Sequence, residues 1–318
     1  MRRIATFAAA FAFAAAAVAQ DYPNRPIKIV QGFAPGGNAD NIARVLGAEM
    51  SKAMGQPIIV EARPGAGGNL AAAVVAKAAP DGYTLLLAVG GHTASGALYR
   101  SLSYRSVEDF EWISTATVFP FLIGVRSDGD AKTMQQLLAA AKARPGTLTY
   151  GTAGIGSTQH LTGELLASMA GLNMVHVPYK GDAGAITALL GGEIVFAVTP
   201  GTALLPHVKS GRLTALAVSG AMRWKGMPDV PTLQEIGVPG FDVGSWAGLA
   251  TTAGTPKPIV QRLHVEMQSA LRLPEVRARL ESFGGEVRGS TPEEMRSRVA
   301  NEIARWSKVI EGAKIPRL

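Results

Sequence analysis

Residues 26–54 read PIKIVQGFAPGGNADNIARVLGAEMSKAM, and this stretch decides the fold. Its first five residues are rich in Ile and Val and predict a buried strand. After a loop with two adjacent glycines, Ile42, Leu46 and Met50 recur every fourth residue, which predicts a helix over 38–54. A strand that leads directly into a helix is the building unit of α/β proteins.

The same unit recurs in the residues that follow. Strands are predicted at 57–60 and 83–89, and a glycine-rich turn at 65–69 leads into a helix at 70–79. This order of strand, helix, strand, helix and strand favours a mostly parallel sheet with helices on both faces.

The pattern then restarts. A long apolar run covers 113–125 and is interrupted by Pro120. The elements predicted after it are strands at 148–151, 174–178, 194–198 and 213–218, helices at 133–144, 158–170 and 184–190, and a short helix that ends at 207–212. Two successive α/β units indicate two similar lobes rather than one large barrel. Because no low-complexity linker separates them, we expect the chain to cross between the lobes within strands.

The C-terminal part is mainly helical, with one helix predicted at 258–273. A second helix starts after Thr291, because a hydroxyl cap, Pro292 at the first position and two acids in the first turn are typical of a helix start. Its apolar stripe predicts packing rather than a binding site. The stripe consists of Met295, Val299, Ile303, Trp306 and Ile310.

The first 19 residues have the pattern of a secretory signal peptide. Two arginines precede a run of Ala, Phe and Val at 4–18, and Ala17-Val18-Ala19 is typical of a cleavage site. The apolar run is shorter than the roughly 20 residues that a membrane-spanning helix needs. Cleavage near Ala19 leaves a net charge of +5 in place of +7. We therefore expect a soluble exported protein, and the absence of cysteine favours the bacterial periplasm.

Composition excludes several functions. Hydrophobic residues make up 47% of the chain and charged residues 17%, so it can bury a core. The basic residues are scattered, which argues against nucleic acid or a polybasic membrane anchor as a partner. With no cysteine there is no disulfide or thiolate ligand. The five histidines lack metal-ligand spacing, and no catalytic or nucleotide-binding motif is complete, so we predict no catalytic residue, metal or cofactor.

Two strand-to-helix loops have the composition of anion sites. In the first, Pro35, Gly36, Gly37 and Asn38 precede a helix whose first N–H groups lack intrahelical partners. We predict that these residues contact a ligand, whereas Asp40 is expected to cap the helix, because a carboxylate repels an anion.

The second loop offers Gly154, Ser157, Thr158 and His160. Here Ser157 or Thr158 either caps the next helix or donates a hydroxyl to a carboxylate. A third loop contributes Tyr179 and Gly181, while Lys180 is expected to be solvated. Two helix starts that face each other across a cleft would bind a small carboxylate.

Short motifs in a fixed order run through nearly the whole chain after the leader. They are Tyr22-Pro23, Pro26-Ile27, Ile29-Val30, Pro35-Gly36-Gly37, Asp40, Ala43-Arg44, Val60-Glu61, Pro64-Gly65-Ala66-Gly67-Gly68, Asp81-Gly82-Tyr83-Thr84-Leu85, Gly156-Ser157, His160-Leu161, Val177-Pro178-Tyr179-Lys180-Gly181, Asp229-Val230-Pro231-Thr232, Trp246, Gly248-Leu249 and Thr291-Pro292-Glu293-Glu294. This ordered set resembles the Bug family, the TctC-type substrate-binding receptors of tripartite tricarboxylate transporters.

The resemblance implies a type II-like periplasmic binding fold whose two α/β lobes close on a ligand in the cleft between them. The crossings near 119–125 and 242–248 divide the chain into lobe 1, at 20–122 and 243–318, and lobe 2, at 123–242. The Pro35-Gly36-Gly37 loop and water would hold one carboxylate, and loops 154–158 and 179–181 would meet the ligand from lobe 2. The resemblance also implies a monomer that delivers an organic acid to a membrane permease.

The chain departs from the family pattern at two places. Ser95-Gly96 stands where the family often has Asn-Pro, and Thr199-Pro200 stands where it often has Asp-Asn. Thr199 thus takes the place of an acid in the candidate site. If that acid meets a ligand ammonium or hydroxyl, its loss argues against an amino-acid ligand.

Two other functions remain open from the sequence. In a secreted α/β hydrolase, Ser157 and His160 would be catalytic partners three residues apart. Alternatively, the protein would present its ligand to a membrane sensor rather than to a permease.

Overall fold

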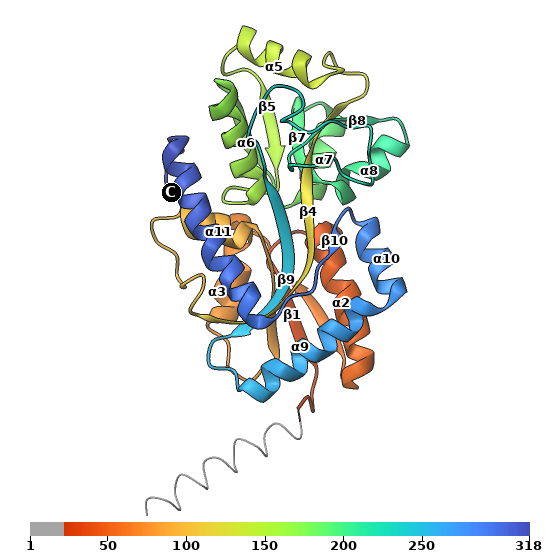
Figure 1. The fold of residues 1–318 in the computed structure, drawn as a ribbon, viewed down its shortest axis with the longest axis vertical. Helices are drawn as coiled ribbons and strands as arrows, with labels where there is room; N and C mark the ends of the chain where they lie inside the picture. Colours follow the sequence, from red (N-terminus) through yellow and green to blue (C-terminus); the bar gives the residue numbers. More distant parts are fainter. Residues whose placement is uncertain (1–21) are drawn as a thin grey trace, which may run out of the picture.

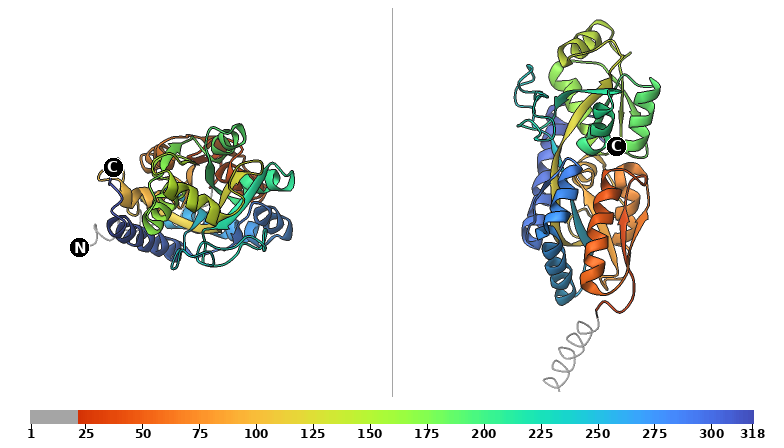
Figure 2. Two further views of the ribbon diagram at one scale, coloured as in Figure 1. Left: turned by 90° about the horizontal axis from the view of Figure 1, so that it is seen from above. Right: turned by 90° about the vertical axis from the view of Figure 1, so that its right-hand side faces the viewer.

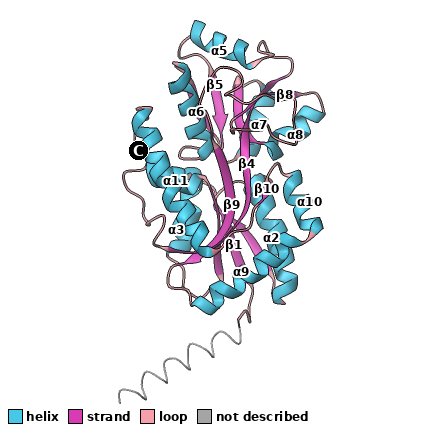
Figure 3. Ribbon diagram, viewed as in Figure 1, coloured by secondary structure: helices cyan, strands magenta, loops and turns pink. Residues whose placement is uncertain are grey.

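The computed structural model describes residues 22–318, so the predicted leader lies outside the described residues. Two lobes are stacked along the long axis, and strands β4 (Phe110–Arg126) and β9 (Gly244–Thr252) run through the centre of the molecule (Figure 1). Lobe 1 contains both ends of the described chain, and lobe 2 contains its middle. Strands form the interior of both lobes and helices lie around them (Figure 3).

Lobe 1 is built from elements at both ends of the sequence. Its strands are β1 (Ile27–Gln31), β2 (Ile58–Ala62), β3 (Thr84–Val89), β9 and β10 (Glu286–Val287). Its helices are α2 (Asn38–Met54), the short 3₁₀ helix η1 (Ala66–Gly68), α3 (Asn69–Ala76), α4 (Gly91–Leu98), α9 (Lys257–Arg272), α10 (Pro274–Ser282) and α11 (Pro292–Gly312).

Lobe 2 is built from the continuous middle segment. Its strands are β5 (Thr149–Thr152), β6 (Val175–Pro178), β7 (Phe196–Pro200) and β8 (Leu213–Val218). Its helices are α5 (Met134–Ala143), α6 (Thr158–Ala170), α7 (Asp182–Gly191) and α8 (Gly201–Lys209). In the side view of Figure 2, helices cover both faces of the central strands.

The sheets are mixed rather than mostly parallel. Strands β2, β1 and β3 are parallel in lobe 1, as are β6, β5 and β7 in lobe 2. Strands β9 and β4 then pair antiparallel with each other, β9 with β3, and β4 with both β7 and β8. The parallel prediction therefore holds for three strands in each lobe and is wrong for the strands at the crossing.

Strand β4 belongs to both sheets, and Pro120 marks the place where it passes from one to the other. Pro120 is the last β4 residue in register with β9, and Phe121 is the first in register with β7. Proline lacks an N–H donor, so it fits a point where the hydrogen-bonded partner changes. Most β4 side chains are buried, which explains why the sequence shows a long, mainly apolar run there.

The predicted helices mostly form, and two others were missed. Helix α2 has the predicted bounds, and α11 begins with the expected cap, in which Thr291 Oγ1 accepts from Glu294 N (3.1 Å). Helix α4 was not predicted because its sequence, GHTASGAL, has two glycines and no apolar period. Helix α10 was missed because it starts at Pro274, directly after α9 ends.

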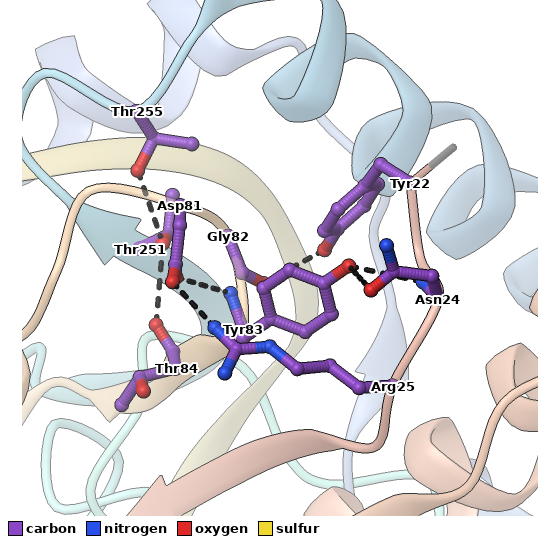
Figure 4. Close-up of polar contacts among 9 residues, drawn as sticks. All are labelled: Tyr22, Asn24, Arg25, Asp81, Gly82, Tyr83, Thr84, Thr251 and Thr255. Carbon is purple, nitrogen blue, oxygen red and sulfur yellow. Dashed lines mark hydrogen bonds and ion pairs between the residues drawn. The ribbon is translucent and has the colours of Figure 1, made fainter. Parts of the chain in front are cut away.

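The first described residues are tied to the base of lobe 1 (Figure 4). The hydroxyl of Tyr22 donates to the carbonyl oxygen of Gly82 (2.7 Å), and Arg25 forms an ion pair with Asp81 (2.7 Å). The Arg25 guanidinium also lies 4.2 Å from the centre of the Tyr83 ring. The segment that follows the predicted cleavage site is therefore part of the folded lobe.

None of the helices within residues 22–318 combines the length and the apolar character needed to cross a bilayer.

Candidate functional site

The two lobes touch each other through their loops. The main-chain N–H of Ala34 in lobe 1 donates to the carbonyl oxygen of Lys180 in lobe 2 (2.9 Å). The hydroxyl of Ser95 in lobe 1 donates to the carbonyl oxygen of Gly156 in lobe 2 (3.1 Å). The structure is therefore that of a closed cleft.

Glycine is required where the lobes approach most closely. Gly67 has a φ of 64°, and a Cβ atom on it would lie 2.7 Å from the carbonyl oxygen of Ile155. Gly181 has a φ of 150°, and a Cβ atom there would lie 3.1 Å from Ala34 N. Both positions favour glycine for their backbone conformation as well as for space.

A small cavity lies between the lobes. Its volume is about 20 Å³, which is room for a water molecule and less than an organic acid of several carbons occupies. Asn38 and Ala39 from the first turn of α2 line it on the lobe 1 side, and Gln159 from the first turn of α6 lines it on the lobe 2 side. The remaining lining residues are Phe33, Val89, Gly91, Phe119, Phe121, Asp182, Pro200 and Ser245. Both predicted helix starts thus meet at one cavity.

An open groove of about 530 Å³ also reaches the start of α2. Gly36, Gly37 and Asn38 line it from lobe 1, and Ala183 and Ile186 of α7 line it from lobe 2. Asn38 lines both this groove and the small cavity, so the two adjoin at the start of α2.

A larger groove of about 650 Å³ lies elsewhere, between the loop 220–226 and helix α11. Its lining contains neither of the two helix starts. Charged residues there are engaged with the protein itself: Arg298 pairs with Glu302, and Arg305 donates to the carbonyl oxygen of Asp242. It therefore lies apart from the two predicted helix starts.

The first predicted loop lies at the cleft, but its cap was wrongly assigned. Helix α2 has Gly37 as its N-cap and no side-chain cap. The carboxylate of Asp40 instead accepts from Gly36 N (3.0 Å) and from Arg44 Nε (2.8 Å). Asp40 therefore holds the loop through the main-chain nitrogen of Gly36. It leaves the N–H groups at the start of α2 for other acceptors.

One of those acceptors is a carboxylate from the opposite lobe, which the sequence analysis missed. Asp182 is the first residue of α7 and is 6% exposed. It accepts from Asn38 N across the cleft and from Gln159 Nε2 (2.9 Å) within lobe 2. Burial raises the pKa of Asp182 to about 6, although both hydrogen bonds oppose that rise.

In the second loop, the two hydroxyls have different environments. Ser157 is the N-cap of α6: its Oγ accepts from His160 N (3.2 Å) and donates to the carbonyl oxygen of Gly154 (2.6 Å). The Thr158 hydroxyl is buried and has no hydrogen-bond partner among the described residues. Ser157 thus caps α6, and the Thr158 hydroxyl is left without a partner in the described part of the chain.

The His160 ring is held inside lobe 2. Its Nδ1 accepts from Gly156 N (3.4 Å), and the ring stacks on His176 with 4.2 Å between the ring centres. Burial lowers the pKa of His160. Ser157 Oγ bonds the main chain of His160 and not its ring, so the pair required by the hydrolase hypothesis is not formed.

The other predicted residues lie in lobe 2. The ring of Tyr179 packs against Gly151 and Gly184 in the lobe 2 core, rather than over the cleft. Gly181 lies at the contact between lobes. Thr199, on β7, is fully buried, and its hydroxyl has no partner in the described part of the chain.

The charge of the cavity differs from the expectation of a purely neutral anion cradle. Asp182 is the one charged side chain among the residues that line it. Within residues 22–318, no group of three or more His, Asp or Glu side chains lies close enough together to hold a metal ion.

Sequence reasoning missed Asp182, Gln159 and Ser245 as residues of the cavity. Asp182 belongs to the third glycine-bearing loop. An acid in the first turn of a helix is so common that it did not indicate a binding residue. Its partner Asn38 lies in the other lobe and could not be inferred from spacing.

Comparison with known proteins agrees with this fold. The sequence profile of the tripartite tricarboxylate transporter family receptor, TctC, matches residues 42–315. Protein BugT of Bordetella pertussis is 35% identical over 98% of this chain and 97% of its own length.

Two solved structures superimpose closely. A Rhodopseudomonas palustris protein with adipate has a TM-score of 0.90 and 35% identity, covering 94% of this chain and 100% of its own. MatC of the same species, with bound malate, has a TM-score of 0.87 and 36% identity, covering 91% of this chain and 100% of its own. The chain therefore belongs to the TctC family of tripartite tricarboxylate transporter receptors, the Bug-type periplasmic binding proteins.

Proposed function

We propose that this protein captures a small organic carboxylate in the periplasm and delivers it to the membrane subunits of a tripartite tricarboxylate transporter. The observation that carries the proposal is that the first turns of α2 and α6 face one cavity from opposite lobes. Main-chain N–H groups at a helix start bind anions without a basic side chain. Malate and adipate, bound by two relatives, are both carboxylates.

We propose that some of the candidate residues contact the ligand and that others hold the binding loops in place. Pro35, Gly36, Gly37 and Asn38 form the lobe 1 side of the site. On the lobe 2 side, the main chain of Gly154–Thr158 and the hydroxyls of Thr158 and Thr199 contact the ligand, whereas Ser157, His160, Tyr179 and Gly181 hold the loops in place. The buried, unpartnered hydroxyls of Thr158 and Thr199 support this assignment.

We propose that capture works by closure of the two lobes about their shared strands. The hinge lies where β4 changes partner, between Pro120 and Phe121, two residues before the predicted boundary at 122/123, and where the chain returns between 242 and 243. One lobe then holds 243–318 with the residues before this point of β4, and the other holds the residues between the two crossings. A ligand that contacts both lobes favours the closed state. The mature chain, cleaved near Ala19, acts as a monomer and catalyses no reaction.

A thermal-shift screen of the mature chain tests the proposal. The panel contains mono- and dicarboxylates, with a neutral sugar and a divalent metal as controls. An acid at 100 times its Kd stabilises the folded state by about 2.7 kcal/mol, which raises the melting temperature. The proposal fails if millimolar organic acids leave the melting temperature unchanged while the sugar or the metal raises it.

A further inference from the structure

We infer that Asp182 determines the ligand class: it reserves one side of the cleft for a hydrogen-bond donor. The site then takes a carboxylate that also carries an ammonium or hydroxyl group, in preference to a simple dicarboxylate. This inference rests on the proposed carboxylate-binding function and specifies the ligand of the same site.

Asp182 already occupies one of the two anion positions. Its carboxylate accepts a hydrogen bond from Asn38 N at the start of α2. It accepts a second one from Gln159 Nε2 (2.9 Å). A carboxylate at a helix start satisfies the N–H groups and the positive end of the helix dipole. The α2 start is thus filled by the protein itself when the lobes are closed.

No cationic side chain among residues 22–318 pairs with Asp182. The cavity lining contains no Lys, Arg or His, and no charged side chain contributes to the shift in its pKa. On the elements packed against it, Asp40 pairs with Arg44, His160 is held by Gly156, and Lys180 is exposed. A carboxylate has about four acceptor positions, and Asp182, which lines the cavity, has free ones that can meet a donor on a ligand.

The α6 start remains for the ligand's own carboxylate. Thr158 lies in the first turn of α6 and is 1% exposed, and its hydroxyl has no hydrogen-bond partner among the described residues. A Cβ atom on Gly90 would lie 2.9 Å from this hydroxyl oxygen and 2.5 Å from that of Ser245, which lines the cavity. Thr158 therefore lies beside the cavity, where its hydroxyl can donate to a ligand. The ligand is oriented with its carboxylate towards α6 and its donor towards Asp182.

A second carboxylate on the ligand would face the Asp182 carboxylate at close range. Like charges in a buried site disfavour each other, so such a ligand must bring a proton with it or displace Asp182 from α2. The sequence comparison argued against an amino-acid ligand because Thr199 replaces an acid at the end of β7. Asp182 supplies an acid from a different element, which reverses that argument.

Calorimetric titration of Asp182→Asn against the wild type tests the inference. The probes are succinate and adipate, their matched amino acids 4-aminobutyrate and 6-aminohexanoate, and the α-substituted acids alanine and lactate, all at pH 7.5. The wild type is expected to bind the best donor-bearing acid at least about tenfold more tightly than either dicarboxylate. Asp182→Asn weakens the donor-bearing acids and tightens the dicarboxylates, each by about tenfold, since one charged hydrogen bond or one like-charge contact changes affinity by that order.

Asp130→Asn is the matched control, because it removes the same charge from an exposed position before α5. It should leave both affinities unchanged. Opposite shifts for the two ligand classes in Asp182→Asn alone support the inference, since a general loss of folding moves both in one direction. If acids bind but Asp182→Asn keeps the wild-type order, the inference about Asp182 fails alone. If no acid binds any of the three proteins, the proposed function fails as well.

Discussion

The main-chain nitrogen of Ala34 lies 2.9 Å from the carbonyl oxygen of Lys180, so the two lobes are joined backbone to backbone. Ala34 is half-buried and the Lys180 side chain is exposed. The contact depends on the path of two loops rather than on side-chain identity. Closure is therefore most sensitive to positions where an added Cβ atom would keep the loops apart.

Gly67→Ala is expected to weaken ligand binding by about tenfold or more. The new Cβ atom would overlap the carbonyl oxygen of Ile155, and relief of the overlap costs about 1–3 kcal/mol of the closed state. Calorimetric titration with an acid from the thermal-shift screen measures the effect. Gly171→Ala is the control, because Gly171 also has a positive φ (62°) but nothing lies within 4 Å of its added Cβ atom. Equal affinities of the two variants would contradict the prediction.

Asp182→Asn is expected to stabilise the closed fold at neutral pH. The pKa of Asp182 is raised to about 6 by burial, so the folded state binds its proton more tightly than the unfolded chain does. Its favourable contribution is complete below about pH 4 and is lost as the pH rises through 6. At 1.4 kcal/mol per tenfold change, ionisation in the fold costs on the order of 3 kcal/mol.

Urea unfolding at pH 4 and pH 8 measures this difference. The variant should exceed the wild type in free energy of unfolding at pH 8, and the gap should close towards pH 4. A gap that is equal at both pH values would show that the amide acts through packing instead.

Acid is expected to destabilise the protein through His92. Burial lowers the pKa of His92 to about 4, and its Nε2 donates to the carbonyl oxygen of Ser106 (2.7 Å). The folded state requires the neutral ring, so stability present above pH 6.5 is lost as the pH falls towards 4. Between pH 7 and pH 4.5 this loss is about 2–3 kcal/mol.

His92→Gln should remove that part of the pH dependence, because an amide can still donate to Ser106 and does not titrate. Chemical unfolding at the two pH values gives the slope. Some slope remains in the variant, because the pKa of buried His176 is lowered to about 3 and acts in the same direction. A variant with the full wild-type slope would exclude His92 as a source.

Tyr22→Phe is expected to lower the free energy of unfolding by about 1 kcal/mol or somewhat more. The change removes the hydroxyl that donates to Gly82 and leaves a half-buried carbonyl without that partner. Thermal unfolding of the mature chain measures it, with ligand affinity as a second readout that should not change because the site lies between the lobes. Unaltered stability would mean that the N-terminal segment contributes little to lobe 1.

The sequence predicted those parts of the fold that depend on local patterns. Helix α2 was placed at its observed bounds because Ile42, Leu46 and Met50 recur every fourth residue, and the structure ends it at Gly55 in a left-handed C-cap. Helix α4 has no such period and is stabilised by packing against α11, far away in the sequence. Strand β4 was recognised as apolar, but its membership of two sheets depends on partners from both lobes.

The same limit applies to the site. The sequence identified both helix starts because glycine-bearing loops before helices are a local signal. It could not assign Asp40, whose role depends on the direction of its carboxylate towards Gly36 N. It also could not assign Asp182, because the meaning of that acid depends on a contact between lobes that exists only in the folded chain.

The shared strand β4 has a consequence for biogenesis. A chain that leaves a membrane translocase amino end first delivers β1, β2 and β3 early, but β9, which separates β3 from β4 in that sheet, arrives only after the whole of lobe 2. The sheet of lobe 1 therefore stays incomplete, with the edge of β3 unpaired, until β9 has been delivered. The sheet of lobe 2 can form around β4 from contiguous sequence. The first lobe is therefore the last to be completed, although three of its strands are the first to be made.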